Sequence, residues 1–321
     1  MKTAAVTDLR EVTIIIRSAG ERTEQLCKEL ILSQGVPESQ LFVVQEVPFS
    51  ASMKRSFKIG MEEGRKWTFC VDADLLLRPG AISDMVRHAE KQKSHVCEIQ
   101  GYVMDKFFGG PRQAGNHLYR TELLGEVIRR IPEEGTSIRP ERYTLGKMEE
   151  DGYPWRVVPC VTGIHDEEQY NRDIYRKAFV QGVKHLERAG LFIGLWRERA
   201  DTDPDYKVAL KGFADSVLNH AEVYINKEQP LYNDLFDKAA FGEKEPLPSN
   251  ALSPEAIGKK IEEWASPEIY FRYFPTRDGL DDLGAAALGK WKKETKEAGL
   301  LRGSLNILGS ILVRTGKRLR S

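Results

Sequence analysis

The chain has 321 residues, of which 48 are basic and 48 are acidic, so its formal net charge at pH 7 is zero. A zero net charge excludes a global field that attracts nucleic acid, and we expect no nucleic-acid partner, although a local basic patch remains compatible with it. We also expect neither an export segment nor a transmembrane anchor, because no stretch reaches the roughly 18 apolar residues of a membrane span.

The first part of the chain alternates strands with helices. A run of β-branched residues at 11–17 predicts a buried strand, and residues 24–35 follow as a helix that ends at a glycine. A strand at 40–47, a helix at 50–64 and a strand at 67–71 come next. Strands alternating with helices at this spacing indicate parallel βαβ units, and hence an α/β fold with a doubly wound, mostly parallel sheet.

The middle of the chain continues this pattern. We expect a helix at 80–92, a strand at 95–104, a glycine-rich turn at 105–116 and a helix at 117–131. A helix, a strand and a loop then fill residues 139–170. From about Asn171 the pattern changes to long polar helices with proline-rich connections, so we place one domain at residues 1–190 and a helical C-terminal region at residues 191–321.

Two carboxylates, Asp72 and Asp74, follow directly after a buried strand in the stretch KWTFCVDADLLLRPGAI. In an extended segment, side chains two apart point the same way, which separates these carboxylates by roughly 6 to 7 Å. Such a pair suits Mg²⁺ or Mn²⁺, which prefer oxygen ligands and keep positions open for water and for a diphosphate. A solvated acidic turn is the alternative. The position favours the metal, because ligands of such sheets lie beyond the carboxyl ends of the strands.

Taken together, TIIIRSAGERT, CVDADLLLRPG and a distal acidic helix followed by a histidine resemble the GT-A glycosyltransferases, most closely family 2. The resemblance covers roughly residues 10 to 170. It implies that a nucleotide-sugar donor binds this domain, that Asp72 lies near the donor ribose and the metal, and that Asp74 coordinates the metal directly.

The resemblance also implies a catalytic base. Family 2 members carry an acidic pair about a dozen residues before a Gly-Tyr, and here this position holds Pro140 and Glu141. Glu141 is therefore the predicted general base, unless it is only an exposed acid in the first turn of a helix. Asp166 and Glu167 are the second choices for that role.

His165 follows the last predicted strand and resembles the histidine that completes the metal site in many GT-A enzymes. A hydrogen-bonded loop histidine is the alternative.

For the donor, Arg17 and Glu21 follow the first strand and are predicted to meet the nucleotide base or ribose. Lys54 and Arg55 are predicted to offset phosphate charge, and a surface ion pair is the alternative for each of these four residues. The turn RSAGERT lacks GxGxxG and GxxxxGK, which argues against a Rossmann dinucleotide site and a P-loop.

Two features bear on where the protein acts. Residues 300–321 place leucines on one helical face and end in basic residues, with no acid after Glu297. Such a helix can bind the anionic inner face of a membrane, or it can pack on its own protein or on a second subunit of a homo-oligomer. Four cysteines without CxxC spacing predict reduced thiols in a cytoplasmic protein: Cys27, Cys70, Cys97 and Cys160.

The sequence thus predicts a metal-dependent glycosyltransferase that moves a sugar, with inversion, from a nucleotide diphosphate sugar to a glycan or lipid-linked acceptor. Two alternatives stay open. A nucleotidyltransferase on a related sheet would use the same acids to hold Mg²⁺, although SAGERT is a poor version of the glycine-rich basic loop it needs. A noncatalytic glycan-binding protein would keep the fold without the reaction.

Overall fold

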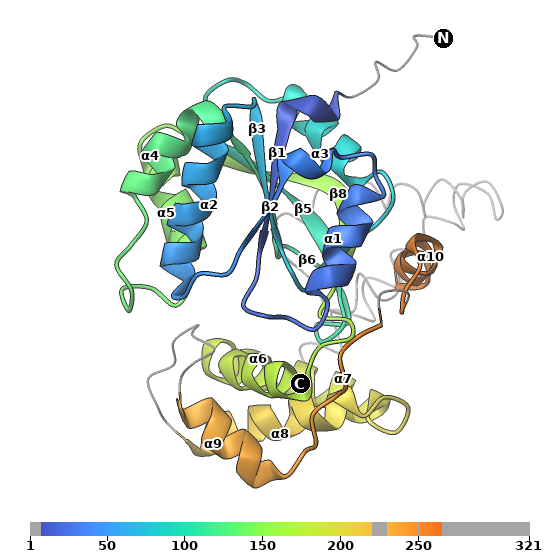
Figure 1. Cartoon of the computed structure of the whole chain (residues 1–321). Coiled ribbons are helices and arrows are strands. Elements are labelled where there is room, and N and C mark those ends of the chain that lie inside the picture. The colour runs from blue at the N-terminus through green and yellow to red at the C-terminus, as the bar shows by residue number, and fades with distance from the viewer. Residues whose placement is uncertain (1–7, 220–229, 249–250, 265–321) are drawn as a thin grey trace, which may run out of the picture. The chain divides into compact units, whose positions relative to one another are not determined.

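A computed structural model describes residues 8–219, 230–248 and 251–264 (Figure 1). These residues belong to one compact unit, Met1–Ala265, and a second unit spans Ser266–Ser321. The predicted basic helix at 300–321 lies outside the described residues.

The core of the unit is an eight-stranded sheet with the order β2-β1-β3-β7-β5-β8-β4, and β6 pairs with β5. Five strands, β1, β2, β3, β5 and β8, run in one direction, while β4, β6 and β7 run against them. The predicted α/β fold with a mostly parallel sheet is confirmed. The strands are β1 (Val12–Arg17), β2 (Leu41–Val44), β3 (Trp67–Asp72), β4 (Leu75–Leu77), β5 (Glu98–Asp105), β6 (Gly110–Arg112), β7 (Asn116–Arg120) and β8 (Trp155–His165).

Helices cover both faces of the sheet (Figure 1). Strand β1 shows why, since Ile14 and Ile16 face one apolar cluster while Ile15 faces another, and all three side chains are fully buried. A strand that is apolar on both sides must be covered on both sides. One cluster includes α1 (Glu24–Leu32), α3 (Ala81–Glu90) and α10 (Pro254–Trp264), and the other includes α2 (Phe49–Glu63), α4 (Leu124–Arg129) and α5 (Pro140–Glu150).

The prediction of one helix at 117–131 is wrong in its first part. Residues 117–120 belong to strand β7, and the α-helix that follows begins only at Leu124. Strand β7 is hydrogen-bonded to β3 on one side and to β5 on the other, so its backbone groups are satisfied by neighbours that are distant in sequence. Its side chains alternate between the two faces, with Leu118 in one apolar cluster and Tyr119 in the other. Tertiary pairing therefore overrides the local helical pattern.

The described elements after Asn171 are all helices. Four of them pack together and lie near the carboxyl ends of the parallel strands (Figure 1). They are α6 (Asn171–Lys184), α7 (Ala189–Arg199), α8 (Asp205–Leu218) and α9 (Pro230–Ala239). Helix α7 is tied to the end of β5 because the indole of Trp196 donates a 2.7 Å hydrogen bond to the carbonyl of Phe107. Among the described helices, none is long and apolar enough to cross a lipid bilayer.

Candidate functional site

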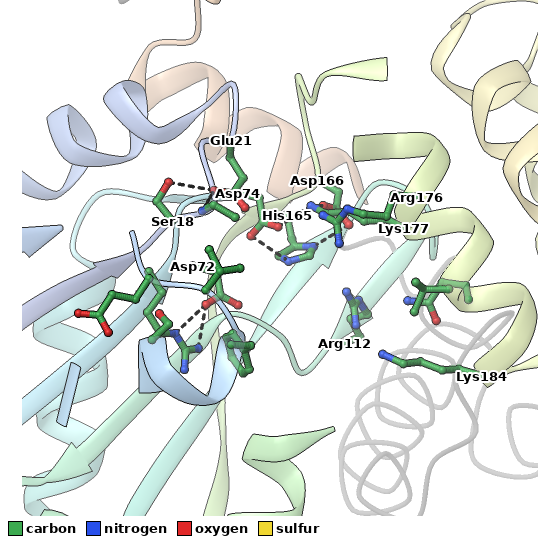
Figure 2. A pocket seen from close by; sticks show the side chains of 18 residues that line it. Ser18, Glu21, Asp72, Asp74, Arg112, His165, Asp166, Arg176, Lys177 and Lys184 are labelled. Atoms are coloured by element: carbon green, nitrogen blue, oxygen red, sulfur yellow. Dashed lines mark hydrogen bonds and ion pairs between the residues drawn. The ribbon is translucent and has the colours of Figure 1, made fainter. Parts of the chain in front are cut away.

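A pocket of about 220 Å³ lies where β1, β3 and β8 end, between the first turn of α2 and the inner face of α6 (Figure 2). Its lining is rich in charged side chains of both signs. The acids are Glu21, Glu46, Asp72, Asp74 and Asp166, and the bases are Arg17, Arg112, His165, Arg176, Lys177 and Lys184. The turn after the first strand and the DAD segment thus line one pocket.

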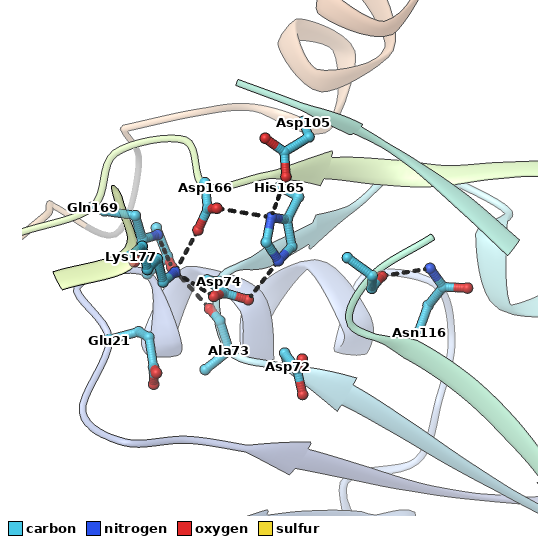
Figure 3. Close-up of polar contacts among 12 residues, drawn as sticks. Glu21, Asp72, Ala73, Asp74, Asp105, Asn116, His165, Asp166, Gln169 and Lys177 are labelled. Atoms are coloured by element: carbon cyan, nitrogen blue, oxygen red, sulfur yellow. Dashed lines mark hydrogen bonds and ion pairs between the residues drawn. The ribbon is translucent and has the colours of Figure 1, made fainter. Parts of the chain in front are cut away.

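Three hydrogen bonds fix the turn that carries Asp72 and Asp74, whose side chains Figure 3 shows. The amide of Ala73 donates to the carbonyl of Arg17 at 2.9 Å, and the hydroxyl of Thr23 donates to the carbonyl of Ala73 at 2.8 Å. The amide of Asp166 donates to the carbonyl of Asp74 at 3.1 Å. The turn is thus held to both β1 and the end of β8, which leaves the side chain of Asp74 little freedom.

Strand β4 explains how His165 reaches the aspartates. It follows the turn at once and pairs antiparallel with β8, with Leu75 opposite His165. The two strands approach closely at Gly163, where an added Cβ would lie 2.2 Å from the carbonyl oxygen of Leu76. Only glycine fits there, so the close pairing that sets His165 beside Asp74 depends on this residue.

His165 and Asp74 form a buried contact whose orientation is set by Asp105 (Figure 3). The imidazole Nδ1 donates to Oδ2 of Asp105 at 2.9 Å, which turns Nε2 toward Asp74. Nε2 lies 3.3 Å from Oδ1 of Asp74 without the alignment of a hydrogen bond. Oδ1 is buried and accepts no hydrogen bond from the part of the chain that the structure describes. A carboxylate that orients a histidine in this way is typical of metal sites.

Lys177 of α6 lies on the other side of Asp74. Its ammonium donates to Oδ2 of Asp74 at 2.5 Å and also to Asp166. Burial by itself would raise the pKa of Asp74, but the charges of Lys177 and His165 outweigh burial and hold this pKa well below its usual value. Burial would lower the pKa of His165, and the charges of Asp166 and Asp74 instead raise it well above its usual value. In this state the group is an ionised network of two acids and two bases.

Three side chains could hold a divalent cation: Asp74, His165 and Asp166 each offer one ligand atom within 4.8 Å of the others. The buried Oδ1 of Asp74 accepts no hydrogen bond from the described residues, and this oxygen together with the other nitrogen and oxygen ligand atoms fits Mg²⁺ or Mn²⁺. Of the predicted metal ligands, the structure brings Asp74 and His165 together. The third predicted ligand, Asp72, is not in this group, and Asp166, predicted as a base, takes its place.

Asp72 is engaged by Arg17 instead. The guanidinium Nε donates to Oδ1 of Asp72 at 2.9 Å, and Nη2 lies 2.8 Å from the same oxygen. The Asp72 carboxylate still lines the pocket, and burial raises its pKa, with Arg17 opposing that shift. Glu21 also lines the pocket, where the amide of Ala19 donates to its Oε2 at 2.6 Å. Arg17, Glu21 and Asp72 thus lie together on the side where the donor was predicted.

Glu141 is held by three hydrogen bonds and an ion pair. Arg17 donates to it through Nη1 at 2.8 Å and Nη2 at 3.3 Å, the hydroxyl of Tyr119 donates at 2.8 Å, and Nε2 of His117 forms an ion pair with it at 2.9 Å. Burial would raise the pKa of Glu141, but the charges of Arg17 and His117 lower it far below its usual value. Glu141 is not among the residues that line the pocket. Its role as general base stays a prediction, and this geometry does not favour it.

The remaining predicted residues lie outside the pocket lining. Lys54 and Arg55 are on the exposed side of α2, where Arg55 pairs with Glu62 at 3.6 Å, so the structure does not bring them to a phosphate in this pocket. Glu167, a second-choice base, is buried and pairs with Lys260 of α10.

Sequence reasoning missed four of the six basic side chains of the pocket. Arg176, Lys177 and Lys184 line it from α6, and Arg112 lines it from β6. A signal existed for the helix, since positions 177, 180, 181 and 184 follow the i, i+3, i+4, i+7 spacing of one helical face. No such period marks Arg112, which depends on the pairing of β6 with β5.

All four cysteines are free thiols in buried positions: Cys27, Cys70, Cys97 and Cys160.

Comparisons with known proteins give weak structural likenesses only. No family model matches the chain, and no curated protein matches it. Among solved structures, the chain is similar to a glycosyltransferase involved in the glycosylation of the major capsid of PBCV-1. The TM-score is 0.33 and the identity is 14%, over 46% of this chain and 81% of that chain.

It is also similar to a mannosyltransferase from Pyrobaculum calidifontis in complex with GDP-Man and Mn²⁺, with a TM-score of 0.34, 12% identity, and coverage of 72% of this chain and 79% of that one. A cytidylyltransferase from Leptospira borgpetersenii gives a TM-score of 0.33 and 11% identity over 49% of this chain and 78% of that one. At this level of similarity, any functional assignment must come from the residues of the pocket.

Proposed function

We propose that the protein is a glycosyltransferase that binds a nucleotide diphosphate sugar in the pocket described above, together with Mg²⁺ or Mn²⁺. The observation that carries this proposal is the pair of Asp74 and His165 with Asp166 beside them, at the carboxyl ends of parallel strands, where the buried Oδ1 of Asp74 accepts no hydrogen bond from the described residues. Ligands of such sheets bind at these ends. The resemblance to family 2 GT-A glycosyltransferases, noted from the sequence, agrees with this position.

In this proposal Asp74 and His165 hold the cation, and Asp105 keeps the imidazole oriented through Nδ1. When bound, the cation would supply positive charge that stabilises the leaving diphosphate. Arg17, Asp72 and Glu21 line the neighbouring part of the pocket and contact the nucleoside of the donor. The acceptor is a glycan or a lipid-linked glycan.

The acceptor hydroxyl must lose a proton, and we assign this proton to the carboxylate of Asp166. Asp166 lines the pocket, whereas Glu141 does not. The charges of His165 and Lys177 outweigh burial and lower the pKa of Asp166, so the carboxylate is ionised, and its place in the pocket rather than a raised basicity supports this assignment. Transfer with inversion follows from attack on the face of the sugar opposite the diphosphate.

A nucleotidyltransferase remains the second candidate, because the same acids would suit attack on an α-phosphate. Products separate the two reactions. A glycosyltransferase releases a nucleoside diphosphate from a nucleotide sugar, whereas a nucleotidyltransferase releases pyrophosphate from a nucleoside triphosphate.

A thermal-shift screen of nucleoside diphosphates and nucleotide sugars, with and without Mg²⁺ or Mn²⁺, tests the proposal. Binding to the folded state at 100 times Kd stabilises it by about 2.7 kcal/mol, which is readily detected. We expect at least one nucleoside diphosphate to raise the melting temperature only when the cation is present. A protein that no nucleotide stabilises, with either cation, would contradict the proposal.

A further inference from the structure

Three cations gather in one part of the pocket, away from the side where Ser18 and Glu21 lie (Figure 2). Arg112 comes from β6, and Arg176 and Lys184 come from α6. The candidate metal group, with Asp74 and its neighbours, lies between these two sides in the same view. The pocket therefore has an acidic side next to β1 and β3 and a basic side next to β6 and α6.

The basic side holds more positive charge than its protein neighbours balance. Arg112 pairs through Nε with Asp105 at 2.5 Å, but Asp105 is shared with His165. Arg176 is 3.4 Å from Asp173 through Nη2, while its buried Nε has no hydrogen-bond acceptor among the described residues. Lys184 forms no ion pair with the part of the chain that the structure describes.

The surroundings of Lys184 disfavour its charge. Burial, followed by repulsion from Arg139, Arg112 and Arg176, lowers the pKa of Lys184 to about 7. The carboxyl end of α6 contributes only partial negative charge at this position. A bound anion would offset the repulsion, because each of these cations can donate a charge-assisted hydrogen bond to an oxyanion.

We propose that Arg112, Arg176 and Lys184 form a binding site for a phosphate group carried by the acceptor. The assignment to the acceptor rests on the proposed function, which puts the donor nucleoside beside Arg17 and Asp72 and the diphosphate at the candidate metal group. The basic site lies beyond that group, on the side of α6, so a second phosphate bound there belongs to the other substrate. Sugar phosphates and lipid-linked phosphates share this chemistry.

Binding of inorganic phosphate, measured by calorimetry at pH 6.5 without divalent cation, tests the site itself. We compare the wild type with Lys184→Gln, with Lys184→Arg as the conservative variant, and with Lys58→Gln as a control at an exposed lysine of α2 outside the pocket. Losing one charge-assisted hydrogen bond should weaken binding about tenfold or more in Lys184→Gln. Lys184→Arg should keep most of the affinity, and Lys58→Gln should match the wild type. Equal affinity in Lys184→Gln and wild type would overturn the proposal.

A second experiment tests whether the site binds a phosphate of the acceptor or of the donor. Affinity for a nucleoside diphosphate with Mg²⁺ should stay within about twofold in Lys184→Gln, and the wild type saturated with that complex should still bind phosphate. If the nucleoside diphosphate affinity instead falls as much as the phosphate affinity, the site belongs to the donor and the acceptor assignment is wrong. Phosphate binding in a protein that binds no nucleotide would confirm the anion site but overturn the proposed transferase function, and with it the assignment of the phosphate to an acceptor.

Discussion

The Glu141→Gln variant tests whether the carboxylate of Glu141 stabilises the fold or serves as the general base. The carboxylate contacts Arg17, whose side chain is 2% exposed, and His117, whose side chain is 8% exposed, and it is itself 12% exposed. An amide keeps the size of the side chain but removes the negative charge. Arg17 would keep Asp72 and His117 would keep Glu98, so neither cation is left without an anion.

The size of the effect follows from these contacts. Removing one partner of a buried ion pair costs about 3–5 kcal/mol, and because each cation keeps a second anion we expect the lower end, about 3 kcal/mol. Burial lowers the pKa of His117, but Glu141 and Glu98 raise it to about 9, so the variant should also show a lower His117 pKa.

Urea unfolding gives the stability and an NMR titration gives the His117 pKa, with Glu134→Gln, at an exposed position, as the matched control. Unchanged stability together with a turnover loss of roughly 10² or more would refute this reasoning and restore Glu141 as the general base.

Three further predictions concern the charges around the pocket. Lys177→Met removes the ammonium that competes with a metal cation at Asp74 and Asp166, so the affinity for Mn²⁺ should rise about tenfold. Electron paramagnetic resonance measures this affinity, and weaker Mn²⁺ binding in the variant would contradict the competition. Asp166→Asn should keep the affinity for nucleoside diphosphate with Mg²⁺ but lower turnover by roughly 10² or more, and loss of binding instead would make Asp166 a cation ligand. Because the folded pKa of His117 is raised from 6.5 to about 9, its stabilising contribution is complete below pH 6.5 and is lost as pH rises through 9. Burial raises the pKa of Glu98 to about 7, so the ionisation of Glu98 also lowers the free energy of unfolding as pH rises. The contribution of His117 to the free energy of unfolding should therefore fall by about 3 kcal/mol between pH 6.5 and 9. A His117→Gln variant with the same pH dependence as the wild type would contradict the assignment of this pH dependence to His117.

The sequence was most informative where burial alone decides the structure. The apolar runs of β1 and β3 are covered on both faces, so their identity as strands follows from composition. The meeting of Asp74 and His165 was expected from the resemblance. Strand β7 was missed, because its identity depends on hydrogen bonds to β3 and β5 and not on a local pattern.

The environment of the site was harder to predict than its position. Glu141 is locked by Arg17, a residue 124 positions away in the sequence, and no local signal reveals that contact. Lys177 lies between two carboxylates because α6 crosses the carboxyl ends of the strands, which is a property of the tertiary fold. Sequence patterns identify which groups are available, whereas the packing of helices against the sheet determines which charges meet.

The central claim is that Asp74 holds a cation for a nucleotide diphosphate, and a calorimetric titration of Asp74→Asn tests it most directly. The amide cannot supply the negative charge that the cation requires. We expect the wild type to bind a nucleoside diphosphate only with Mg²⁺ or Mn²⁺, and the variant to lose this cation-dependent binding while its circular dichroism spectrum stays that of the wild type. Cation-dependent binding of equal affinity in the folded variant would contradict the claim.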